Sequence, residues 1–181
     1  MRSVKQLFLG LLCLSFILTG CSGKNVIPMD DYESTALGIV LEKPETWIVE
    51  EAEGALYLAT IQEALDNQAL EDEAAISIST STTFNFNDTE DPVAIVNEFI
   101  NRFQSTGEGL VITQEAAALT IQGQPAAQAV FNGAIADQAG FFTLSAIVDD
   151  GNVIVLFSID GSSDNRYAEV IQQVTNSLQF K

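Results

Sequence analysis

The chain contains no histidine, and both of its cysteines lie within the first 21 of its 181 residues. Histidine is the commonest general base and the commonest metal ligand in proteins. A serine nucleophile would therefore need a lysine as its base. Lys24, Lys43 and Lys181 fall in segments that we expect to be a tether, a turn and the tail. These absences predict that the protein is not an enzyme and uses no cofactor.

Positive charge is scarce as well. From residue 21 onward the sequence has 25 Asp and Glu but only five Lys and Arg, which gives a net charge of −20. Such a surface repels nucleic acid and anionic lipid headgroups, so we expect no nucleic-acid partner. The acidic residues gather near expected turns, where carboxylates are solvated. This placement does not favour the paired carboxylates of a glycosidase.

The first 20 residues have the pattern of a secretory signal peptide. Arg2 and Lys5 precede an apolar run from Leu7 to Leu18, as in the charged and apolar regions of such a leader. The run is too short to span a bilayer comfortably. We therefore expect residues 1–20 to be removed.

The residues that follow this run are Leu18-Thr19-Gly20-Cys21, and they resemble the lipobox of bacterial lipoproteins. The resemblance implies cleavage before Cys21, a diacylglycerol on its thiol and an acylated new amino terminus. Two acyl chains hold a protein at a membrane stably. We therefore expect lipidation at Cys21, with the domain outside the cytoplasm and anchored to the bacterial cell membrane or outer membrane. An ordinary signal peptide with an unmodified cysteine is the alternative.

The segment after Cys21 is polar, and we expect residues 21–33 to be an irregular tether and residues 34–181 to form one globular domain. Alternating apolar and polar residues, interrupted by turn residues, predict the first strands of this domain. Residues 61–73 have helical spacing over part of their length and favour a short helix or a loop. The expected strands are 38–42, 47–50, 55–59 and 75–83.

Two amphipathic helices are predicted further along the chain. Asp91-Pro92 opens the first, because Asp is a good N-cap and Pro is tolerated at the first helical position. Ser162 or Ser163 is expected to cap the second. The apolar face of the first helix is Val93, Val96, Phe99, Ile100 and Phe103, and that of the second is Tyr167, Val170, Ile171, Val174 and Leu178.

Between the helices the pattern predicts a β-meander, with strands at 110–112, 118–121, 126–136, 140–148 and 153–159. Asp150-Gly151 is a strong two-residue hairpin signal. Residues 153–159 are apolar at consecutive positions, so both faces of this strand should be buried. The fold class is therefore α+β, with an antiparallel sheet of about six to seven strands covered by helices.

Four short segments occur in order within this layout: Gly38-Ile39-Val40-Leu41, Pro44-Glu45-Thr46-Trp47, Gly123-Gln124-Pro125-Ala126 and Ser177-Leu178-Gln179-Phe180. With them, the layout resembles the PsbP-like fold over most of residues 32–181. The resemblance implies an α/β/α sandwich that is mostly non-catalytic and docks to other proteins. We therefore predict a lipid-anchored, non-catalytic envelope protein that acts as a protein-binding or assembly module for another envelope protein. The alternative is a small-ligand carrier with a pocket between sheet and helix.

Two sets of side chains before the first helix are candidate sites. Oxygen ligands at Asn87, Asp88, Glu90 and Asp91 have a spacing that suits calcium. The segment lacks the glycine and distal Glu of an EF-hand, and the start of a helix accounts for Asp88 and Asp91, so no metal site is predicted.

Aromatic residues are the other set. Phe84 and Phe86 point to one side of the chain, and they are the candidates for a contact patch if that side is open. Trp47 and Tyr57 could line a ligand groove as well, but aromatic residues in strands are more often part of the core.

Overall fold

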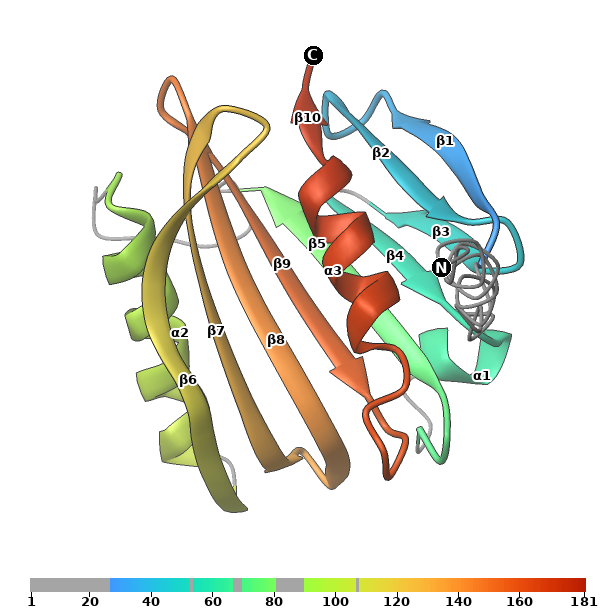
Figure 1. Cartoon of the computed structure of the whole chain (residues 1–181), viewed down its shortest axis with the longest axis vertical. Helices are drawn as coiled ribbons and strands as arrows, with labels where there is room; N and C mark the ends of the chain where they lie inside the picture. Colours follow the sequence, from blue (N-terminus) through green and yellow to red (C-terminus); the bar gives the residue numbers. More distant parts are fainter. Residues whose placement is uncertain (1–26, 53, 67–69, 81–89, 107) are drawn as a thin grey trace, which may run out of the picture.

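The computed structural model describes residues 27–52, 54–66, 70–80, 90–106 and 108–181. Seven of its strands form one sheet: β3 (Ile48–Ala52), β4 (Ala55–Ala59), β5 (Ala74–Thr80), β6 (Glu108–Ile121), β7 (Gln124–Ile135), β8 (Gln138–Asp149) and β9 (Asn152–Asp160). Their order across the sheet is β3-β4-β5-β9-β8-β7-β6, and each neighbouring pair is antiparallel (Figure 1).

Three tight hairpins connect β6, β7, β8 and β9. Each turn consists of two residues with positive φ, which is the geometry of a type I′ turn and matches the twist of the strands. The hairpin predicted at Asp150-Gly151 is confirmed. The φ angles are 49° and 87° at Gln122 and Gly123, 48° and 65° at Ala136 and Asp137, and 48° and 83° at Asp150 and Gly151.

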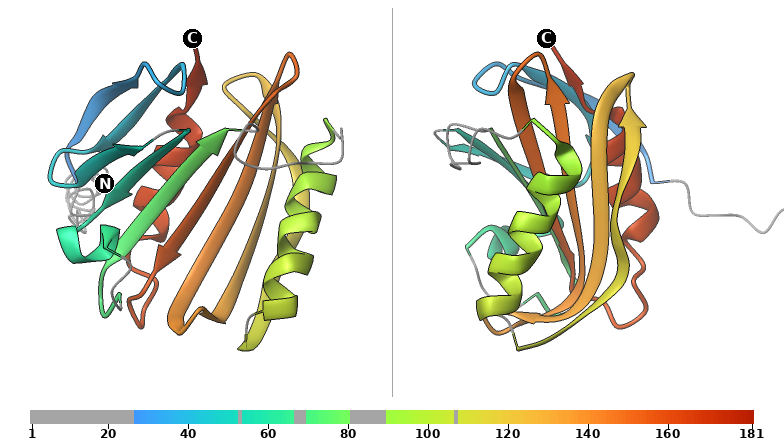
Figure 2. Two further views of the ribbon diagram at one scale, coloured as in Figure 1. Left: turned by 180° about the vertical axis from the view of Figure 1, so that it is seen from behind. Right: turned by 90° about the vertical axis from the view of Figure 1, so that its left-hand side faces the viewer.

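The two longer helices, α2 (Pro92–Thr106) and α3 (Ala168–Ser177), cover opposite faces of the sheet (Figure 2). α2 packs on β6, β7 and β8 through the fully buried Ile95 and Val96. α3 buries Val174 on the other side. Residues 153–156 of β9 are all buried, which confirms that both faces of this strand are covered. The α+β sandwich expected from the sequence is therefore the observed fold.

A small second sheet lies beside the large one. Its strands are β1 (Met29–Ser34), β2 (Ile39–Pro44) and β10 (Gln179–Phe180), in the order β1-β2-β10. The prediction of irregular structure before residue 34 is wrong for β1, which pairs with β2 from Met29 opposite Pro44 to Ser34 opposite Ile39. Pairing with the next strand of the chain, β2, stabilises β1, and the polar composition of β1 does not reveal this pairing.

β6 is a second departure from the predicted elements. The sequence predicts separate strands at 110–112 and 118–121, because the polar Thr113-Gln114-Glu115 interrupts the apolar pattern. The structure has one strand, which stays paired with β7 through register shifts between Ile112 and Ala117. Such bulges let a strand absorb residues that do not fit the alternation.

The start of α3 depends on Asp160, a buried carboxylate with 1% of its surface exposed. It accepts hydrogen bonds from the backbone N–H groups of Ser162 and Tyr167, each at 2.8 Å, and from the Ser162 hydroxyl. The Ser162 hydroxyl in turn accepts the Arg166 N–H at 3.0 Å. The prediction that Ser162 or Ser163 caps the helix is wrong, because these bonds hold the preceding loop and the helix begins only at Ala168.

Candidate functional site

A hollow of about 500 Å³ lies on the same side of the sheet as α2, next to the short helix α1 (Gln62–Leu65). α2 packs on β6, β7 and β8, whereas α1 packs on β4 and β5 (Figure 2). The residues that line the hollow come from the region between these two helices. Its volume is in the range of small-molecule sites, roughly 300–1,000 Å³. We call it the α1 hollow; it is lined by Glu50, Tyr57, Ala64, Leu65, Leu70, Ala75, Ile76, Ser77, Ile135, Ala136, Gln138, Phe142, Phe157 and Ile159.

The floor of the α1 hollow contains a row of cross-strand neighbours. Glu50 lies opposite Tyr57, Tyr57 opposite Ser77, and Ser77 opposite Phe157. Directly opposed residues point to the same face of a sheet, so the row runs from the edge strand β3 toward the centre. Tyr57 is 37% exposed, whereas Phe142, which stacks on Phe157 and also lines the hollow, is only 1% exposed. The floor therefore changes from open and polar to closed and apolar.

The walls come from segments far apart in the sequence. The Leu70 backbone N–H donates a hydrogen bond of 2.9 Å to Oε1 of Gln138, which joins the segment after α1 to the β7–β8 hairpin. Ala64 and Leu65 of α1 form another part of the wall. A bond of 3.1 Å from the Ala74 N–H to the Thr60 hydroxyl ties both ends of the α1 segment together. The hollow is therefore held by tertiary contacts.

Phenylalanine rings close the inner end of the hollow. Phe142 and Phe157 stack with their ring centroids 5.8 Å apart. Phe157 also contacts Phe103 of α2 at 5.0 Å, and Phe142 stacks on Phe131 at 5.4 Å. Phe142 is only 1% exposed, so the surface that this end offers to an apolar or aromatic group is the half-buried ring of Phe157, which the other rings hold in place.

Three polar side chains of the hollow have no partner in the part of the chain that the structure describes. Within the described residues, the Glu50 carboxylate and the hydroxyls of Tyr57 and Ser77 have no hydrogen bond or ion pair. No Lys or Arg is among the lining residues. The described cations bind elsewhere: Arg102 to Glu98, Arg166 to Asp72, Lys181 to Glu33, and Lys43 to the Pro44 carbonyl.

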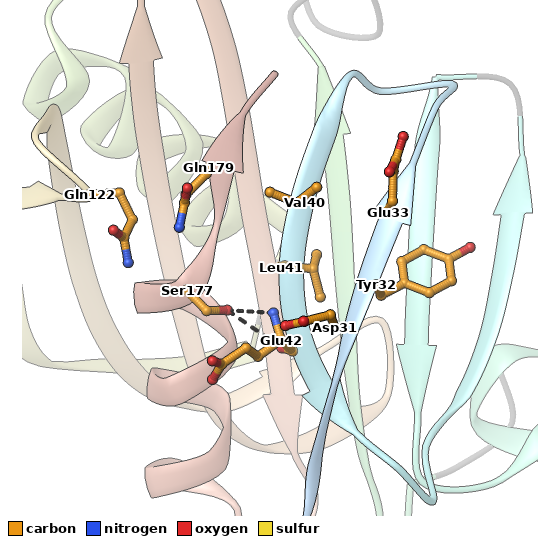
Figure 3. A pocket seen from close by; sticks show the side chains of 9 residues that line it. All are labelled: Asp31, Tyr32, Glu33, Val40, Leu41, Glu42, Gln122, Ser177 and Gln179. Carbon is orange, nitrogen blue, oxygen red and sulfur yellow. Dashed lines mark hydrogen bonds between the residues drawn. The ribbon is translucent and has the colours of Figure 1, made fainter.

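A second hollow, of about 490 Å³, lies between the small sheet and the end of α3 (Figure 3). Its polar groups are largely occupied within the protein. The Glu42 N–H donates to the Ser177 hydroxyl at 2.8 Å, and the Gln122 amide donates to the Asn176 carbonyl at 2.8 Å. Figure 3 shows the Ser177 hydroxyl directed at Glu42 and the Tyr32 ring turned away from it. This groove is therefore the weaker candidate.

Several predicted site residues lie outside the described residues, namely Cys21, Phe84, Phe86, Asn87 and Asp88. Of the remaining calcium candidates, Asp91 caps α2, since its carboxylate accepts the Val93 N–H at 3.0 Å. Glu90 is exposed beside it. The described part of the chain contains no cluster of three or more His, Cys, Asp or Glu that could hold a metal.

Trp47 and Tyr57, which the sequence predicts to be core residues, lie in different environments. Trp47 is buried and packs edge-on against Tyr167, with ring centroids 6.1 Å apart. Tyr57 lines the α1 hollow instead. The sequence did not identify Ser77 or Phe157 as site residues. The alternation of Ile76, Ser77 and Ile78 did predict one buried face, and the opposite face of that strand forms the floor of the hollow.

The fold is the α+β sandwich of PsbP-like domains, and three solved structures share it at low sequence identity. CyanoP, the PsbP of the cyanobacterium Synechocystis sp. PCC 6803, superposes with a TM-score of 0.53 at 15% identity, over 91% of this chain and 99% of CyanoP. LpqN, described as involved in cell envelope biogenesis of Mycobacterium tuberculosis, gives 0.55 at 16% identity, over 87% and 92%. PA94 of Pseudomonas aeruginosa, a protein of unknown function, gives 0.51 at 13% identity, over 84% and 97%.

These likenesses establish the fold alone. No family model matches the sequence, and no curated protein matches it. None of the helices in the described ranges is long and apolar enough to cross a membrane.

Proposed function

We propose that the chain is a lipid-anchored, non-catalytic binding protein of the cell envelope, with its domain outside the cytoplasm and the α1 hollow as its binding site. The observation that carries this proposal is the pairing of an apolar, preformed hollow with polar atoms that have no partner in the described residues. Ligand sites combine these two features, because apolar walls supply affinity and a few polar groups fix orientation.

The anchor and the location are supported by the sequence and by one structural neighbour. Leu18-Thr19-Gly20-Cys21 directly follows an apolar leader, as in bacterial lipoproteins. LpqN, which shares the fold, is described as involved in cell envelope biogenesis. The absence of histidine from the whole sequence supports a role in binding, since the commonest general base is missing.

Native mass spectrometry of the protein isolated from its own membrane tests the binding role. We expect a small molecule bound to the wild-type chain in equal stoichiometry. Ser77→Phe places a large ring in the hollow and should remove the bound mass, whereas Ser77→Ala should retain it. A wild-type chain with no bound mass, or a bound mass that persists in Ser77→Phe, would contradict the assignment of the hollow.

A second candidate function is that of an assembly module, and the exposed edge of β6 favours it. β6 is the last strand of the large sheet, and Val111 and Ile112 are 57% and 36% exposed on it. An open edge strand can pair with a strand of another protein. Val111→Lys would place a charge on this edge and should release an envelope partner that is cross-linked to the wild-type chain. Retention of that partner would count against this role.

A further inference from the structure

We propose that the α1 hollow accepts an amphiphile that has an apolar or aromatic body and a cationic amine head. The inference rests on the proposed function, because it takes the hollow to be a ligand site. It adds the sign of the ligand's charge and the direction in which the ligand lies. Both follow from the row of residues that crosses the floor.

The open end of the row favours a positive charge. Glu50 lies on the edge strand β3, is exposed and has no ion-pair partner among the described residues. It lies directly opposite Tyr57, whose hydroxyl is also free. An ammonium group here would meet a carboxylate, a hydroxyl and an aromatic ring, which attracts cations through its face.

The opposite charge is disfavoured at the same place. Among the described residues, the lining includes no cation that could hold a carboxylate or a phosphate. From residue 21 onward the sequence carries 25 acidic and five basic residues, and this excess concentrates cations and repels anions near the surface. A fatty acid or a phospholipid headgroup would therefore bind less well than an amine of the same shape.

The inner end of the row fits the apolar body. Phe157 lies two strands from Tyr57 along the row and stacks on Phe142. Ile159, which lies opposite Phe142 on β8, is buried next to this pair. The ligand would thus place its amine at Glu50 and its body on the half-buried Phe157 ring, with the Ser77 hydroxyl between them.

Three probes of one shape and different charge test this inference: phenylbutylamine, phenylbutanol and phenylbutyrate. The full chain is held in nanodiscs of neutral phosphatidylcholine, and binding is measured by equilibrium dialysis against empty nanodiscs. We expect the amine to bind most tightly and the carboxylate least. Glu50→Gln should weaken amine binding about three- to fivefold, as for an exposed ion pair, and leave phenylbutanol unchanged.

Two controls locate the effect. Glu63→Gln removes a carboxylate from α1 that is exposed but does not line the hollow, and it should leave the affinity of both probes unchanged. Ser77→Phe should abolish binding of all three probes while its circular dichroism spectrum matches that of the wild type. Binding that survives in this folded variant would overturn the inference, because the probe would then lie elsewhere.

The outcomes separate the inference from the proposed function. If phenylbutanol or phenylbutyrate binds as tightly as the amine and Ser77→Phe removes that binding, the hollow is a ligand site but the charge assignment is wrong. If none of the probes binds and native mass spectrometry still detects a bound molecule, only the ligand class is overturned. If neither experiment detects a ligand, both proposals are overturned.

Discussion

Ala136 has a φ of 48°, a left-handed conformation that is unfavourable for a residue with a Cβ. It occupies the first position of the β7–β8 turn, where asparagine and glycine are preferred. We predict that Ala136→Asn raises the free energy of unfolding by about 0.5–1 kcal/mol, because asparagine tolerates this conformation. Urea unfolding followed by circular dichroism measures the change. A less stable variant would contradict the turn assignment.

Gly161 is required for a different reason, which is close packing. A Cβ at this position would lie 1.7 Å from the carbonyl oxygen of Leu70, a wall residue of the α1 hollow. We predict that Gly161→Ala lowers the free energy of unfolding by about 2 kcal/mol or more, since backbone must move. Gly123→Ala is the control for a conformational effect without crowding: Gly123 has a positive φ of 87°, and its Cβ would meet open space, so only the conformational cost of about 1 kcal/mol is expected.

Ionisation of the Tyr167 phenol should lower the stability of the fold at alkaline pH. Burial, and then the nearby Glu73 carboxylate, raise the pKa of its phenol above the ordinary value of 10.0. The folded state therefore favours the neutral phenol. The contribution of this preference to the free energy of unfolding is complete below about pH 10 and is lost as pH rises through the folded pKa. We predict that wild type loses stability relative to Tyr167→Phe above about pH 10. Chemical denaturation of both chains at a series of pH values checks this, and a constant difference would contradict it.

The carboxylates near the starts of α2 and α3 show what the sequence can predict at the scale of residues. Asp91 was identified from the sequence because its partner, the Val93 N–H, lies two residues away. Asp160 was not, because its role depends on burial beneath α3 and on a loop that reaches Tyr167. Local sequence cannot indicate whether a carboxylate at the end of a strand is buried or solvated.

At the scale of elements, a strong hydrophobic periodicity was sufficient to predict a helix or a strand in the segments that have one. β4 was predicted at 55–59, as observed, and α2 begins after Asp91 as expected. β1 and β10 were missed because their strand conformation depends on pairing with β2, with Met29 opposite Pro44 and Gln179 opposite Val40. The sequence allowed a pocket between sheet and helix as an alternative but not the residues that line the α1 hollow, because its walls join segments that the sequence places far apart.

The N-cap of α2 yields a prediction at the scale of the element. Asp91→Ala removes the acceptor for the Val93 N–H and should cost about 1 kcal/mol of stability, with Asp91→Asn closer to wild type. Since this carboxylate is already used by the helix, we also expect millimolar calcium to leave the thermal midpoint of the wild-type chain unchanged. A midpoint that rises with calcium in wild type and not in Asp91→Ala would instead assign Asp91 to an ion site.

At the scale of the whole molecule, the proposed lipid anchor would determine where the domain works. We predict that the chain recovered from its host begins at Cys21 and carries the mass of acyl chains, and that Cys21→Ser moves the protein from the membrane fraction to the soluble fraction. Membrane fractionation with mass spectrometry of the first peptide measures both. An unacylated first residue, or an uncleaved leader, would contradict the anchor.

The proposed binding role depends on how the sheet is covered. α2 and α3 lie on opposite faces, but α2 packs on β6, β7 and β8 and leaves the neighbouring surface of β4 and β5 to the short α1. The hollow is the consequence of this unequal cover, and its polar edge and aromatic base come from single residues along one cross-strand row.

The most direct measurement is photo-cross-linking with a diazirine derivative of phenylbutylamine, followed by mass spectrometry of the modified peptides. Our structure predicts modification at residues of the α1 hollow, such as Tyr57, Ser77 or Phe157, and its loss in Ser77→Phe. Modification confined to the groove around Glu42 and Ser177, or no modification above that of empty nanodiscs, would contradict the assignment of the α1 hollow as the binding site.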